Sequence, residues 1–93
     1  MVLMLPKIKL ALRYNNTLFD DEIRMYINAC TEDLYLAGIN KSLITDTDDI
    51  IVNTATAYCK WQLNFQGKGA EWEKIYKGLK TSLALNKDYT NVD

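Results

Sequence analysis

The chain has no histidine, a single proline, two cysteines and a net charge of only −1 over its 93 residues. Without histidine, the usual general base, proton shuttle and imidazole metal ligand are all missing, which removes most hydrolase and metalloenzyme designs. Two cysteines cannot complete a zinc site on their own. We therefore predict a protein that is not an enzyme, with no catalytic residue, no cofactor and no bound metal.

The charge balance also argues against a nucleic-acid-binding domain, since 11 basic residues face 12 acidic ones. No apolar run approaches the ~18 residues of a membrane span. Pro6, Lys7 and Lys9 interrupt the apolar N-terminus, which lacks the pattern of a signal peptide. We expect a cytosolic protein without a membrane partner, and its 48% apolar content is that of a folded domain.

Four stretches have the period of amphipathic helices, and none alternates like a strand. The pattern predicts an all-α protein, a single small bundle of about four helices over residues 1–85 and a flexible C-terminal tail over residues 86–93. The predicted helices cover residues 2–14, 19–37, 45 or 46 to 65, and 71–85. Turns at residues 15–17, a longer connection at 38–46 and a break at 66–69 separate them.

Each predicted helix carries one apolar stripe and charges suited to its ends. The second begins with acids at 20–22, is expected to be capped by Thr17, and ends at Gly38. Asp46, Asp48 and Asp49 load the start of the third with negative charge; a calcium loop would need glycine and glutamate where Ile51 and Ala57 stand. The stripes comprise Ile23, Ile27, Cys30 and Leu34; then Ile51, Ala55, Tyr58 and Cys59; then Trp72, Ile75, Tyr76, Leu79 and Leu83.

The two cysteines therefore lie on predicted core faces, where cysteine behaves as a small hydrophobe. Reactive thiolates need an exposed, positively charged setting. We predict that Cys30 and Cys59 are buried, and that a cytosolic protein keeps them reduced.

The first predicted helix has more apolar residues than one stripe requires, which indicates a second contact surface and hence an oligomer. Trp61 and Phe65 flank the break at Gly67, where an aromatic side chain either joins helices or anchors a partner. The predicted oligomer or partner interface consists of Met4, Leu5, Ile8, Trp61, Phe65, Asp88 and Tyr89.

The order of these features resembles the small head–tail connector, or adaptor, proteins of tailed bacteriophages and prophages. The matching run is LALRYNNTLFDDEIRMYINACTEDLYLAGI, a short acidic linker, IIVNTATAYCKWQLNF, a glycine-containing turn and EWEKIYKGLKTSLALNKDY. The resemblance implies a structural subunit that forms a ring of about twelve copies by head-to-tail contacts. It also implies two protein partners, the portal and a tail-completion or stopper protein, with DNA only as cargo passing through the channel.

The same resemblance implies a place at the capsid–tail junction of the virion, reached from the host cytoplasm during assembly. The tail after Leu85 would become ordered on meeting the portal or the next ring. Two other functions stay open at this point. One is a DNA-binding regulator that uses Asn53, Thr56, Lys60 and Asn64 on a recognition helix. The other, an enzyme built on Cys59, lacks a base.

Overall fold

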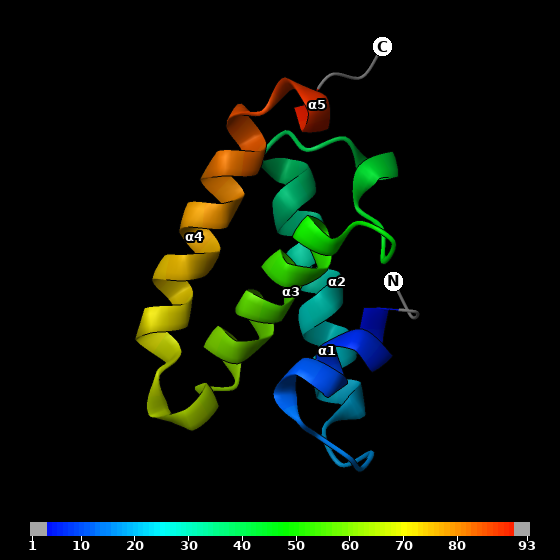
Figure 1. Cartoon of the computed structure of the whole chain (residues 1–93), viewed down its shortest axis with the longest axis vertical. Helices are drawn as coiled ribbons and strands as arrows, with labels where there is room; N and C mark the ends of the chain where they lie inside the picture. The colour runs from blue at the N-terminus through cyan, green and yellow to red at the C-terminus, as the bar shows by residue number, and fades with distance from the viewer. Residues whose placement is uncertain (1–3, 91–93) are drawn as a thin grey trace.

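A computed structural model describes residues 4–90 as an all-α bundle, as predicted, with no strand in that range (Figure 1). Val2 and Leu3, which the sequence assigned to the first helix, lie outside the described residues. The elements are α1 (Met4–Leu12), α2 (Asp20–Leu36), η1 (Lys41–Leu43), α3 (Asp49–Gln62), η2 (Phe65–Gly67), α4 (Gly69–Leu85) and α5 (Lys87–Thr90).

Helix α3 is the centre of the bundle, because it packs against α1, α2 and α4 (Figure 1). The predicted stripe of α2 is confirmed, since Ile23, Ile27, Cys30 and Leu34 are all buried. Burying a large aliphatic side chain contributes about 1.5–3 kcal/mol. The α1, α3 and α4 residues that share this core are Met4, Leu5, Ile8, Leu12, Ile51, Ala55, Ala57, Cys59, Tyr76 and Leu83.

The start of α2 differs from the prediction. Phe19 is its N-cap residue and makes no side-chain cap bond, so the cap expected from Thr17 is wrong. Thr17 contributes its backbone carbonyl instead, which accepts a hydrogen bond from Asp20 N at 3.2 Å. Three acids in the first turn still favour this end of the helix electrostatically. Gly38 follows the helix with a φ of 105°, the left-handed conformation expected there.

Helix α3 begins later than predicted because Asp48 is its cap. The carboxylate of Asp48 accepts hydrogen bonds from Ile50 N at 2.9 Å and Ile51 N at 3.3 Å. The residues before it form η1 and a turn. The helix also ends earlier, at Gln62 rather than residue 65, because Asn64 adopts a left-handed conformation with a φ of 49°.

The turn between α3 and α4 is held by a side-chain hydrogen bond, where the sequence predicted only a break between two helices. Asn64 Oδ1 accepts a hydrogen bond from Gly69 N at 2.9 Å, and α4 starts at Gly69 rather than at residue 71. A Cβ at Gly69 would lie 2.8 Å from Asn64 Oδ1 and 3.1 Å from the Trp61 carbonyl oxygen. Only glycine fits this close approach of the two helix ends.

Fewer residues of α4 are buried than the apolar stripe in its sequence predicted. Tyr76 and Leu83 are buried, and Trp72 and Leu79 are partly buried. Ile75 is 45% exposed, so its assignment to the core stripe is wrong. The reason is that α4 packs mainly on α3, which covers only one side of it.

The end of the described chain contacts the bundle. Tyr89, in α5, donates from its hydroxyl to Asp48 Oδ2 at 2.8 Å and accepts at its carbonyl from Asn40 N at 2.7 Å. Residues 91–93 lie outside the described range. The mobility expected of residues 86–93, and the domain division at residue 85, stay predictions.

Candidate interaction surfaces

The α1 residues predicted at an interface lie in the core of the subunit. Met4, Leu5 and Ile8 are between 0% and 6% exposed. They therefore have little surface left for another chain, and their interface role stays a prediction. The large apolar side chain that α1 does present to solvent is Leu10, which is 81% exposed.

The other four predicted interface residues do not form one patch. Trp61 is half-buried near the C-terminal end of α3, and Phe65 follows it, with its ring centroid 6.4 Å from that of Tyr14. Asp88 is exposed and Tyr89 half-buried, both in α5 at the far end of the bundle (Figure 1). The structure thus separates Trp61 and Phe65 from the α5 pair.

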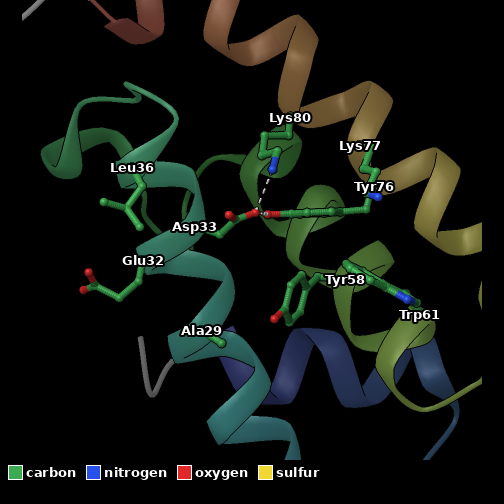
Figure 2. Close-up of a pocket in the computed structure, with 9 residues that line it drawn as sticks. All are labelled: Ala29, Glu32, Asp33, Leu36, Tyr58, Trp61, Tyr76, Lys77 and Lys80. Atoms are coloured by element: carbon green, nitrogen blue, oxygen red, sulfur yellow. Dashed lines mark hydrogen bonds and ion pairs between the residues drawn. The ribbon is translucent and has the colours of Figure 1, made fainter.

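A groove lies between α2 and α4, which face each other across α3 (Figure 2). Its volume is about 480 Å³. We call it the aromatic groove, because α3 and α4 supply its ring side chains. Its lining residues are Ala29, Glu32, Asp33, Leu36, Tyr58, Trp61, Tyr76, Lys77 and Lys80.

Three aromatic rings pack against one another in this groove. Tyr58 lies edge-on to Tyr76 at a centroid distance of 5.0 Å and to Trp61 at 5.5 Å. Trp61 and Tyr76 are 6.0 Å apart. Edge-to-face contacts of this kind are favourable and hold the rings in fixed orientations. The groove therefore has a rigid apolar wall.

A buried tyrosine links the two sides of the groove. Tyr76 Oη donates to Asp33 Oδ2 at 2.6 Å, and Lys80 Nζ donates to the same oxygen at 3.0 Å (Figure 2). Partial burial alone would raise the pKa of Asp33, but these hydrogen bonds and the Lys80 charge outweigh it and hold the pKa below its ordinary value. Asp33 is thus a fixed anion that clamps α2 to α4.

Of the two adjacent acids Glu32 and Asp33, only Asp33 takes part in this clamp. Adjacent helical residues do point in different directions, and here only Asp33 turns towards α4. The sequence did contain one indication that Asp33 faces the bundle, because Asp33 lies three residues after the buried Cys30 and so shares its side of α2. The Cys30 thiol approaches Tyr76 Oη at 3.9 Å.

The charges along the groove are balanced with one exception. Lys80 pairs with Asp33, and Lys77 pairs with Glu73 at 2.7 Å. Both lysine ammonium groups also lie within 6 Å of aromatic ring centroids. Glu32 is exposed and has no hydrogen bond or ion pair within the described chain.

A second surface lies where α1 turns into α2. Leu10 and Leu18 are 81% and 77% exposed there, and Arg13 is exposed with no ion pair to any described residue. We call these three residues the α1–α2 corner. A hollow of about 360 Å³, which Leu10 helps to line, is formed by α1, the turn and the first residue of α2, and Lys9 and Asp20 in its lining pair at 2.8 Å.

The two cysteines are not in a setting that favours reaction of their thiols. Cys30 and Cys59 are both buried and unpaired, and burial raises the pKa of each thiol to about 12. A thiol with that pKa is almost wholly protonated at neutral pH and is a poor nucleophile. Within residues 4–90, no group of three or more acidic or cysteine side chains is arranged to hold a metal ion.

The recognition face proposed for a DNA-binding regulator is largely occupied. Thr56 is buried and donates to the Val52 carbonyl at 2.8 Å, while Lys60 lies over the Trp72 ring at 4.3 Å. Only Asn53 and Asn64 of that set are exposed. A recognition helix must project from its domain into the DNA groove, whereas α3 is the central helix of this one.

These observations define a small all-α domain with two hollows on its described surface, the aromatic groove and the hollow beside the α1–α2 corner. Comparison with protein families matches residues 4–90 to the family described as phage connector protein. Because the match covers nearly the whole chain, this protein belongs to the phage connector family, as its sequence resemblance predicted. The family is structural, and membership makes the chain a virion component that works with other capsid and tail proteins.

No curated protein and no solved structure matches the chain. Among the described helices, none combines the length and the apolar character needed to cross a bilayer.

Proposed function

We propose that this subunit forms a ring between the portal and the tail of a tailed phage, seals the capsid vertex and lets DNA pass. The observation that carries the proposal is the family match over residues 4–90. A closed ring of about twelve subunits needs two different complementary faces on each copy. The aromatic groove and the α1–α2 corner, built by different helices, are two such candidates.

The near-neutral charge supports a conducting role. A strongly basic channel would hold the phosphate backbone through many ionic contacts and slow its passage. With 11 basic and 12 acidic residues, the subunit offers no such excess. DNA is then a passing cargo, and the portal and a tail-completion or stopper protein are the partners.

The remaining predicted interface residues fit contacts along the ring axis. Trp61, near the end of α3, and Phe65, in η2, precede the turn into α4, whereas Asp88 and Tyr89 belong to α5, which lies at the opposite end of α4 (Figure 1). We propose that these ends meet the neighbouring rings of the connector, with residues 86–93 becoming fixed on docking.

DNA retention in purified heads tests the proposed function. Heads assembled without this subunit should package DNA, lose it to nuclease and fail to join tails, and adding the purified subunit should restore protection. Heads that retain their DNA and join tails equally well without the subunit would refute the proposal.

A further inference from the structure

The aromatic groove leaves one charged side chain without an ion pair and one large apolar side chain exposed. Its one unbalanced charge is Glu32, and beside it Leu36 is 81% exposed, one helical turn further along α2. An occupant should therefore bring a cation together with apolar side chains. Burial of the exposed aliphatic group in a contact is favourable, and a carboxylate beside it favours a partner that carries a cation.

The α1–α2 corner has the matching character. Arg13 is a cation with no ion pair to any described residue, and it lies in sequence between Leu10 and Leu18, two of the most exposed leucines in the described chain. Its φ of 60° is a conformation that costs a non-glycine residue free energy. That backbone turns the chain after α1 and leaves the guanidinium in solvent.

We infer that the aromatic groove of one subunit receives the α1–α2 corner of a second copy, with Arg13 of one chain pairing with Glu32 of the next. This inference rests on the proposed ring and names its lateral contact. Leu10 and Leu18 of the incoming corner would cover Leu36. Guanidinium and carboxylate groups form two-point hydrogen bonds, which fix orientation as well as attract.

A second copy fits better than an unrelated chain for two reasons. The charges and apolar groups of the two surfaces are complementary, and no residue lines both hollows. One subunit can therefore donate its corner and accept another at the same time. That is the head-to-tail contact that closes into a ring.

Charge reversal tests the contact. Glu32→Lys and Arg13→Glu should each lower the amount of subunit assembled on purified portal rings by roughly tenfold, because each places like charges together. An equimolar mixture of the two variants should assemble again, since a ring in which they alternate joins a cation to an anion at every junction. Glu71→Lys, the same charge change on α4 outside the groove, should assemble like the wild type.

Cross-linking provides an independent measurement. Leu10→Cys combined with Leu36→Cys, oxidised on the portal, should give a ladder of covalent multimers, while Leu85→Cys with Leu36→Cys should not. The native cysteines are buried and do not interfere. Circular dichroism of each variant confirms that it is folded.

The outcomes separate the two proposals. A wild-type chain that forms no ring on portal overturns the proposed function and the lateral contact together. A wild-type ring in which the single reversals assemble normally, the mixture stays unassembled, or the Leu85 pair cross-links instead of the Leu10 pair overturns the lateral contact alone.

Discussion

Replacing Tyr76 with phenylalanine should weaken the clamp between α2 and α4 while leaving the aromatic ring in place. The lost hydroxyl donates to Asp33 at 2.6 Å, and a hydrogen bond to a charged group contributes about 1.5–3 kcal/mol. The Asp33 side chain is 40% exposed and keeps Lys80, so water and the ammonium replace part of the loss. We expect Tyr76→Phe to lower the free energy of unfolding by about 1 kcal/mol.

Thermal and urea unfolding followed by circular dichroism measure this effect. For a domain of this size, a loss of about 1 kcal/mol corresponds to a fall in Tm of about 4–8 °C. Tyr26→Phe is the matched control, because Tyr26 donates to Glu22 on the surface of α2, where substitutions change stability by less than about 0.5 kcal/mol. If Tyr76→Phe is no less stable than Tyr26→Phe, the clamp does not hold the helices together.

The other predictions concern acid stability, thiol reactivity and two glycines. The pKa of Asp33 is depressed in the folded state, so the stability that this carboxylate gives the fold is present above its ordinary pKa of 3.8 and is lost as pH falls through the folded pKa. Asp33→Asn should therefore show a smaller fall in Tm than the wild type below about pH 4. Cys30 and Cys59 should react with a thiol reagent at about pH 8 only after urea unfolds the chain, and rapid reaction of the native protein would contradict their burial. Gly78→Ala, in open space on α4, should raise the free energy of unfolding by about 0.5–1 kcal/mol. Gly69→Ala should lower it, because the added Cβ meets Asn64 and the α3 backbone. Equal changes in Tm for the two variants would refute the close approach at Gly69.

Helix faces could be predicted from the sequence because burial repeats with the helical period. The α2 stripe from Ile23 to Leu34 is buried as the spacing required, and the acids at residues 20–22 lie in the first turn of α2 as predicted. The sequence placed three acids near the start of α3, but it did not identify Asp48 as the residue that caps this helix.

The surfaces could not be predicted in the same way. Ile75 belongs to the α4 stripe by spacing, yet it is 45% exposed because α3 covers mainly one side of α4. Conversely, α1 has more apolar residues than one buried face needs, which predicted a second contact surface. In the structure, α2 and α3 together bury Met4, Leu5 and Ile8, and Leu10 is exposed. The Asp33 clamp depends on the angle between α2 and α4, which local spacing does not encode.

Native mass spectrometry of purified portal rings mixed with this chain decides whether it is the subunit of a connector ring. We expect a discrete complex in which one portal ring carries a closed set of about twelve copies of the chain. A mixture in which the portal rings keep their own mass and the chain stays at 10.7 kDa would contradict the proposed function.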